Sequence, residues 1–112
     1  MADSLRRDGC ITRFRCSTRP DRLDAALLAR LRRHGCRTVE LGIQSFSDTA
    51  LQASERHYSG RQATEACRLV RDAGLALGVQ LLPGMPGHQP EDFLADVRRA
   101  LDLGADMLRF YP

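Results

Sequence analysis

The strongest constraint in this sequence is a repeated order of helix, glycine and strand. Gly35, Gly74 and Gly104 each follow a segment with apolar residues at helical spacing, and a short apolar segment soon follows each glycine. Glycine in such a place takes the left-handed backbone conformation that ends a helix. Strands that alternate with helices pair in parallel through right-handed crossovers. The sequence therefore predicts an α/β domain with a parallel sheet.

Hydrophobic periodicity places about four strands and the helices that cover them. We expect strands at residues 10–18, 38–43, 75–82 and 106–111. Each expected helix has a start signal, either a capping side chain or a proline in the first turn. These helices run from Asp21 or Asp24 to Arg33, from Ser47 over Ala53, from Ser59 to Gly74 and from Pro90 to Gly104.

Four parallel strands fit two architectures that periodicity cannot separate. One is a small open α/β sheet, and the other is half of an eight-stranded (β/α) TIM-type barrel, which normally takes about 250 residues. The last expected strand stops at Pro112 with no helix after it. A strand without its crossover partner exposes unpaired edge groups. We therefore expect residues 1–112 to be a single partial barrel domain, a fragment of a longer chain.

Composition limits the surroundings and the partners. The net charge is only +3 and every basic residue is arginine, so a nucleic-acid partner stays undetermined. The helical cluster Arg30, Arg32 and Arg33 is predicted to be a solvated face. No segment approaches the roughly 18 consecutive apolar residues of a membrane span, and Met1 to Asp8 is too polar for a secretory signal. We expect a cytoplasmic protein with no membrane partner.

The four cysteines do not have the spacing of a metal site. Cys10, Cys16, Cys36 and Cys67 match neither paired Cys-x-x-Cys zinc ligands nor a triplet for an iron-sulfur cluster. We expect no metal ligands from this chain. In a chain without a secretory signal, buried free thiols are the simpler interpretation.

Ligands of parallel α/β folds collect at the carboxyl ends of the strands, so the polar residues there are candidates for binding. Ser17, Gln44 and Gln80 stand at the ends of three expected strands. Gln44 offers an amide donor and acceptor to a nucleoside or a carboxylate, although a buried amide satisfied by backbone is equally common.

The segment Pro83-Gly84-Met85-Pro86-Gly87 is the most unusual strand end. Its two glycines and two prolines fix a loop in which a ligand could approach bare backbone at Gly84, Met85 and Pro86, although a tight turn with no ligand explains it as well. Arg56, expected at the start of the next helical segment, could pair with a carboxylate or stay on the surface. His88 is expected to be a solvated loop histidine.

Taken in order, the strand ends resemble the radical S-adenosylmethionine superfamily, in particular its branch with the Elongator catalytic subunit and oxygen-independent coproporphyrinogen III dehydrogenase. Four stretches carry the resemblance to its third to sixth barrel strands, namely Ser17-Thr18-Arg19-Pro20-Asp21, Val39 to Phe46, Leu82 to Gly87 and Leu108 to Pro112. The likeness runs from about residue 11 to the end of the chain.

The resemblance implies a barrel half that cradles S-adenosylmethionine. It implies that Gln44 and Arg56 contact the methionyl or ribose part and that residues 84–87 lie near the adenosyl end. The haem-pathway members carry glutamate where Ser17 stands and aspartate where Gln80 stands, so these two departures favour Elongator-like or uncharacterised members.

The resemblance also implies a [4Fe-4S] cluster in the parent protein, held by Cys-x-x-x-Cys-x-x-Cys. None of the four cysteines has those neighbours, so we expect this chain alone not to bind the cluster and to be inert.

Two functions remain open. The first is the cofactor-binding part of a radical enzyme, an oxidoreductase or transferase, that needs the missing upstream and downstream parts of the barrel. The second is a half-barrel without catalysis that serves as a binding module or self-assembles through its exposed sheet edges.

Overall fold

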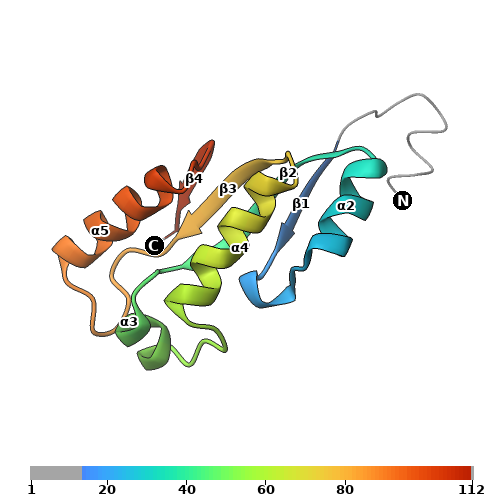
Figure 1. Ribbon diagram of the computed structural model, residues 1–112. Coiled ribbons are helices and arrows are strands. Elements are labelled where there is room, and N and C mark those ends of the chain that lie inside the picture. The colour runs from blue at the N-terminus through green and yellow to red at the C-terminus, as the bar shows by residue number, and fades with distance from the viewer. Residues whose placement is uncertain (1–13, 112) are drawn as a thin grey trace.

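Four strands form one parallel sheet in the order β1-β2-β3-β4 (Figure 1). The structure, a computed structural model, describes residues 14–111. Its strands are β1 (Phe14–Thr18), β2 (Cys36–Gln44), β3 (Ala76–Leu81) and β4 (Met107–Phe110). The predicted parallel sheet is confirmed. Residues 10–13 of the first expected strand, Cys10 among them, lie outside the described residues, as does Pro112.

The helices follow the expected start and stop signals. They are α2 (Ala25–Arg33), α3 (Asp48–Ala53), α4 (Gly60–Asp72) and α5 (Pro90–Asp102), with a 3-10 turn η1 at Pro20–Arg22. Asp24 caps α2 by accepting from the Leu27 amide at 2.7 Å, whereas Asp21 lies in the 3-10 turn. The glycines after α2, α4 and α5 have φ values of 101°, 80° and 87°, as a left-handed helix stop requires.

All three long helices pack against the same face of the sheet (Figure 1). From Val39 in β2 and from Leu77 in β3, every second residue points toward them and is fully buried, namely Val39, Leu41, Ile43, Leu77, Val79 and Leu81. The helices contribute Leu28, Ala63, Ala66, Cys67, Val70 and Ala100 to the same core. An open doubly wound sheet would carry helices on both faces. Because the helices cover only one face, the structure favours the partial barrel over the open sheet.

The intervening strand residues form what we call the open face, which no described helix covers. It carries Arg15, Ser17, Thr38, Glu40, Gly42, Gln44, Ala76, Gly78, Gln80, Met107 and Arg109. This face is polar, with glycine where the opposite face has valine or leucine. In a closed barrel it would line the interior.

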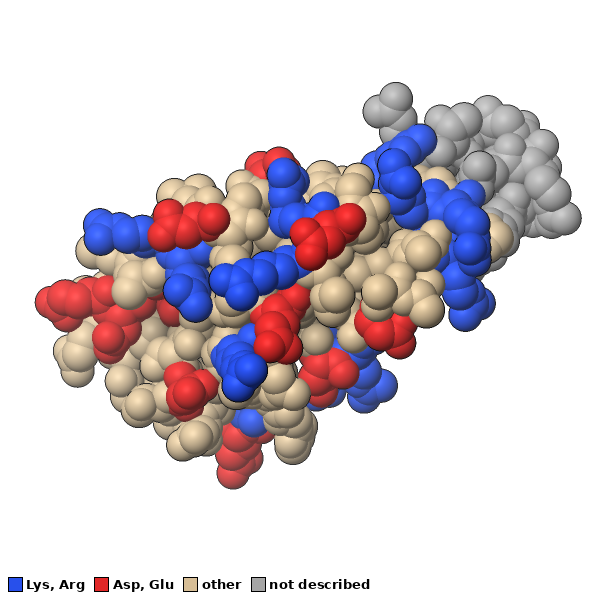
Figure 2. Space-filling view, in the orientation of Figure 1, with Lys and Arg blue, Asp and Glu red and all other residues tan. Residues whose placement is uncertain are grey.

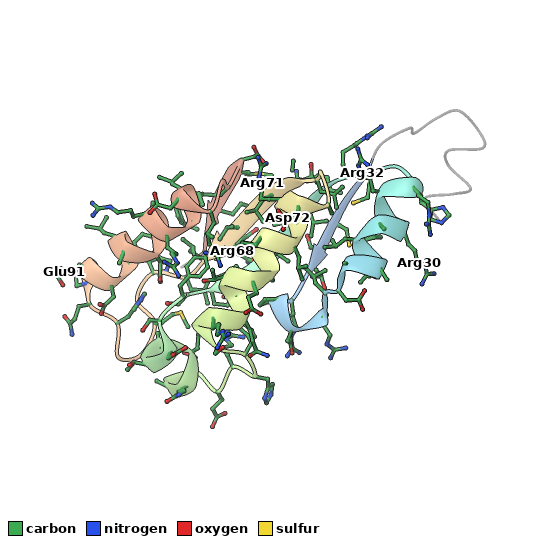
Figure 3. The ribbon with its side chains drawn as sticks, in the orientation of Figure 1. Arg30, Arg32, Arg68, Arg71, Asp72 and Glu91 are labelled. Carbon is green, nitrogen blue, oxygen red and sulfur yellow. The ribbon has the colours of Figure 1, made fainter. Side chains whose placement is uncertain are left out.

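The outer surface of the helices carries charges of both signs. Figure 2 shows acidic and basic side chains interspersed on this side, and Figure 3 shows Arg68, Arg71 and Asp72 projecting from α4. Arg30, Arg32 and Arg33 are exposed on α2, which confirms the predicted solvated face. No helix among residues 14–111 is long and apolar enough to span a membrane.

A buried polar cluster ties the end of β2 to α5 and to the loop before it. The Ser45 hydroxyl donates to Oδ2 of Asp96 at 2.7 Å, and the Phe46 amide donates to Oδ1 at 3.0 Å. His88 places Nε2 at 3.2 Å from the same carboxylate, with 1% of its side chain exposed. The prediction of a solvated His88 was wrong, because α5 carries a carboxylate that draws the ring inward.

The N-terminus of α4 lies directly against the end of β2. The Gly60 amide donates to Oδ1 of Asp48 at 2.8 Å, and a Cβ on Gly60 would overlap the carbonyl oxygen of Phe46. Gly84 differs, because a Cβ there would meet no atom within 4 Å although its φ is 75°. Only glycine fits the close approach at position 60.

We expect Asp96→Ala to lower the free energy of unfolding by about 3 kcal/mol, because it leaves a buried hydroxyl, amide and imidazole without an acceptor. Asp102→Ala on the exposed part of the same helix should change it by less than about 0.5 kcal/mol. Urea unfolding followed by circular dichroism measures both. Equal losses in the two variants would contradict the structural role of Asp96.

We expect Gly60→Ala to cost roughly 3 kcal/mol of unfolding free energy, because the new methyl group must push α4 away from the Phe46 carbonyl. Gly84→Ala should cost about 1 kcal/mol, since it meets only the left-handed backbone penalty. Thermal unfolding of the two variants side by side tests this order. A Gly60 variant as stable as the Gly84 variant would show that the two elements do not meet so closely.

Candidate functional site

A pocket of 470 Å³ opens where β1, β2 and β3 end. Strand residues form one side of it, and the loop between α3 and α4 forms the other. The pocket is lined by Ser17, Thr18, Arg19, Gly42, Gln44, Glu55, Arg56, His57, Tyr58 and Gln80. It therefore lies at the edge of the sheet where ligands of parallel α/β folds bind.

Two amide side chains meet above Gly42. The Nε2 atom of Gln44 lies 3.2 Å, and Oε1 of Gln80 3.6 Å, from the position that a Cβ on Gly42 would take. A Cβ at position 42 would crowd the Gln44 amide and touch that of Gln80. The missing side chain thus leaves room for a paired donor and acceptor in the pocket.

Gln44 has an unusual backbone conformation that turns its side chain at the end of β2. Its φ is 69°, and the pairing between β2 and β3 shifts register between Gly42 and Gln44. Such a conformation costs a non-glycine residue about 1–3 kcal/mol and persists only where the surroundings hold it. Here the Leu82 amide donates to the Gln44 carbonyl at 3.0 Å, and the Asp96 cluster holds the next two residues.

Tyr58 forms a buried wall of the pocket. Its hydroxyl lies 2.9 Å from the Gly42 carbonyl and 2.8 Å from the Ile43 carbonyl, to which it donates. Burial raises the pKa of Tyr58 to about 12, with Arg56 acting weakly in the opposite sense. The ring therefore stays neutral and fixes the loop of α3 and α4 to the end of β2.

Arg56 lies in the loop between α3 and α4, so its predicted place at the start of a helix was wrong. Glu55, with φ of 57°, ends α3 and turns the chain, and the Arg56 amide donates to the Leu51 carbonyl at 2.9 Å. The guanidinium is exposed at the pocket and has no carboxylate partner among the described residues. It can therefore pair with an anionic group of a ligand.

The structure brings together four of the predicted site residues and leaves three apart. Ser17, Gln44, Arg56 and Gln80 line this pocket, whereas Gly84, Met85 and Pro86 do not. The loop of these three packs toward α3, where a Cβ on Gly87 would lie 3.5 Å from Cγ2 of Thr49. Met85 is buried with 6% of its surface exposed.

The three cysteines within the described residues do not form a group that could hold a metal ion. Cys36 and Cys67 are buried and Cys16 is half-buried, which agrees with buried thiols for the first two. Burial raises the pKa of Cys67 to about 12 and also raises that of Cys36. Residues 14–111 hold no group of three or more histidine, cysteine or acidic side chains that could hold a metal ion. The described residues therefore do not fit an iron-sulfur cluster.

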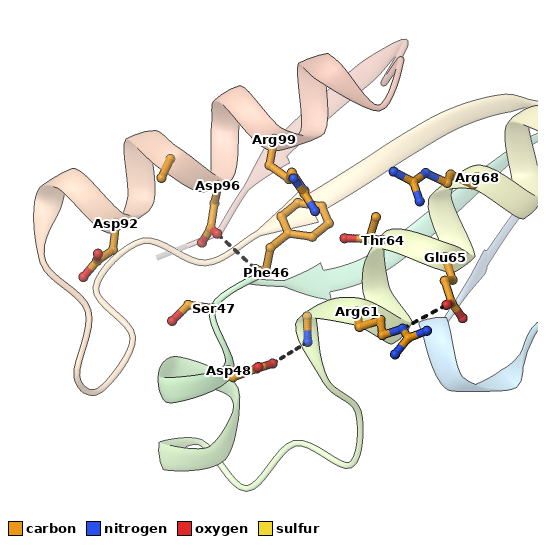
Figure 4. Close-up of a pocket in the computed structure, with 12 residues that line it drawn as sticks. Phe46, Ser47, Asp48, Arg61, Thr64, Glu65, Arg68, Asp92, Asp96 and Arg99 are labelled. Carbon is orange, nitrogen blue, oxygen red and sulfur yellow. Dashed lines mark hydrogen bonds and ion pairs between the residues drawn. The ribbon is translucent and has the colours of Figure 1, made fainter.

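A second hollow of 660 Å³ lies between α4 and α5 on the outer side of the sheet (Figure 4). Its walls include Arg61, Arg68, Arg99 and the Asp96 carboxylate, and sequence patterns gave no sign of it. Arg61 is already paired with Glu65 at 3.3 Å. This hollow lies on the helix side and away from the carboxyl ends of the strands, so the pocket at Gln44 is the stronger candidate for ligand binding.

Comparisons with known proteins agree with this fold. Residues 2–100 match the family described as the Radical SAM superfamily. The chain is 32% identical over 98 residues to a tRNA uridine(34) acetyltransferase of Methanocaldococcus infernus, covering 85% of this chain and 18% of the relative. It is 29% identical over 93 residues to the heme chaperone HemW of Escherichia coli, covering 82% of this chain and 25% of the relative.

Solved structures share the fold. The chain matches Elp3 of Methanocaldococcus infernus with a TM-score of 0.82 and 30% identity, over 90% of this chain and 24% of that one. It matches the methyltransferase TsrM of Kitasatospora setae, solved with tryptophan and an S-adenosylmethionine analogue, with a TM-score of 0.76 and 25% identity. That match covers 97% of this chain and 22% of TsrM.

This chain spans about a fifth to a quarter of the length of these relatives and structures. The family match, in contrast, covers most of its residues, and its partial barrel is the fold of structural neighbours in the same superfamily. The chain belongs to the radical S-adenosylmethionine superfamily.

Proposed function

We propose that this chain is the S-adenosylmethionine-binding part of a radical enzyme and that the pocket at Gln44 holds the cofactor. The observation that carries the proposal is the convergence of Ser17, Gln44, Arg56 and Gln80 on one pocket from three strands and a loop. These residues are far apart in the sequence, so only the fold unites them. Membership of the superfamily makes the cofactor the natural ligand of such a pocket.

The donor set of the pocket fits the parts of this cofactor. Arg56 has no acidic partner in the described chain and offers a guanidinium to the carboxylate. The amides of Gln44 and Gln80 and the hydroxyl of Ser17 offer neutral donors and acceptors to the ribose or the amino group. Tyr58 keeps the α3–α4 loop against β2, so that the loop side and the strand side stay aligned.

In this superfamily the bound cofactor and a [4Fe-4S] cluster together supply radical chemistry. We propose that the cluster is held by residues outside this chain and that the chain alone is inert. The reaction we favour is an Elongator-like one. Ser17 and Gln80 stand where the haem-pathway members have acidic residues, and the identities to three tRNA uridine(34) acetyltransferases are 30% to 35%. We propose a cytoplasmic location for the whole protein.

A second candidate function rests on exposed apolar side chains of α5 and of β4, the last strand of the described sheet, which we call the apolar patch. Leu94 and Leu101 of α5 are 64% and 57% exposed, and Phe110 of β4 is 50% exposed. In a longer protein the next strand and helix of the barrel would cover this patch. A second copy of the chain could cover it instead, which is the self-assembly function.

For the cofactor site, we expect Arg56→Ala and Gln80→Ala each to weaken binding of S-adenosylmethionine by about tenfold, which is about 1.4 kcal/mol. The first variant loses a charge-assisted contact and the second a neutral one. Arg61→Ala, an exposed change on α4 away from this pocket, should bind like the wild type. Isothermal titration calorimetry on the 112-residue chain measures the three variants. Equal affinity in all of them would refute this assignment of the pocket.

For the second candidate, we expect Leu101→Glu to convert a dimer to a monomer if a second copy covers the patch, because a charge cannot enter an apolar interface. Asp102→Asn provides a neighbouring control that leaves the patch intact. Sedimentation at several concentrations gives the mass. A single-chain mass for the wild type at every concentration would rule out self-assembly.

A further inference from the structure

A carboxylate on the open face bridges two arginines from different strands. Glu40 of β2 places Oε2 3.4 Å from Nη2 of Arg15 on β1 and Oε1 3.1 Å from Nε of Arg109 on β4. The Glu40 side chain is only 11% exposed, whereas those of Arg15 and Arg109 are 49% and 41% exposed. The three side chains therefore form a row across the face that would line a closed barrel.

Gly78 of β3 makes this row possible. In the strand register Glu40 pairs with Gly78, and Gly78 pairs with Met107 of β4. A Cβ on Gly78 would lie 3.3 Å from Cγ of Glu40 and 3.4 Å from its Cβ. Glu40 thus crosses over β3 where that strand has no side chain, and reaches the guanidinium two strands away.

The three side chains of the row carry a net charge of +1. Two guanidinium groups share a single carboxylate, and no other acidic residue lies on the open face as defined above. The contact with Glu40 uses Nε of Arg109, and the side chain of Tyr111 hydrogen-bonds to the same guanidinium. A guanidinium has five N–H donors, so this half-exposed group keeps terminal donors for a further partner. The hydrogen bond with Tyr111 and the charge of Glu40 both raise the pKa of Arg109, which therefore keeps its charge.

Arg109 is next to the cofactor pocket. It pairs in register with Gln80, which lines that pocket, and both side chains lie on the open face. Arg56 faces the pocket from the loop between α3 and α4, whereas Arg109 comes from the β4 side. A ligand in the pocket would thus have a second guanidinium at its border with the barrel interior.

We propose that Arg109 binds an anionic group, a carboxylate or a phosphate, of the molecule that reacts beside the cofactor. This inference rests on the proposed function and adds the substrate class. Glu40 holds Nε and, with Tyr111, orients the planar group, so that the remaining terminal N–H donors can form hydrogen bonds to the oxygens of the anion. Neutral substrates without such a group would leave the excess charge without a partner.

The test follows the arginine Nε–H signals of the 15N-labelled chain by NMR during titration with inorganic phosphate or with acetate. We expect the Arg109 signal to shift and saturate, and the ion that binds more tightly identifies the class of group. Arg109→Gln should weaken that binding at least tenfold, while Arg98→Gln, an exposed change on α5, should leave it within twofold. Uniform shifts of all arginine signals, or equal losses in both variants, would overturn the proposal.

Calorimetry with S-adenosylmethionine separates this inference from the proposed function. Binding of the cofactor should stay within twofold of wild type in Arg109→Gln. A tenfold loss would overturn the proposal, because the anion would then be the carboxylate of the cofactor itself. A wild-type chain that binds no cofactor would refute the proposed function. A wild-type chain that binds the cofactor, but whose Arg109 signal does not shift and saturate with either ion, would refute the role of Arg109.

Discussion

The packing of all long helices on one face of the sheet determines how every strand residue is used. Val39, Leu41, Leu77 and Val79 supply the apolar core on the helix side and are fully buried. No described helix packs on the other face, which can therefore carry amides, charges and glycines. Stability and binding are thus assigned to alternate residues of the same strands. A shift of one residue in strand register would exchange the two roles.

The binding side depends on a strained turn that the helix side holds in place. Gln44 has a φ of 69°, and the residues after it are fixed by the Asp96 carboxylate of α5. The helix that buries apolar surface thereby also sets the direction in which the Gln44 amide leaves the sheet. His88 joins the same carboxylate from the loop before α5. This one buried group therefore couples the core, the loop and the edge of the pocket.

Sequence patterns predicted the features that depend on local physics. The helix stops at Gly35, Gly74 and Gly104 follow from backbone preference alone, and the parallel sheet follows from the order of elements. The place of Arg56 was predicted wrongly because the left-handed turn at Glu55 ends α3 before it. The burial of His88 was predicted wrongly because it depends on the packing of Asp96 of α5 against Ser45 at the end of β2. The role of Gly78 was likewise hidden, since it depends on the register that sets Glu40 beside it. Periodicity gives the face of a residue and not its neighbour on the next strand.

Closing the barrel changes the energetics of the open face. Here water reaches the half-exposed guanidinium groups of Arg15 and Arg109, and ion pairs that water screens contribute little stability. Structural neighbours in the superfamily are barrels, in which the corresponding face lies inside. Screening weakens there, and an unmatched positive charge becomes costly unless an anion accompanies it. The excess charge is therefore better explained by a ligand that enters the barrel than by the stability of the sheet.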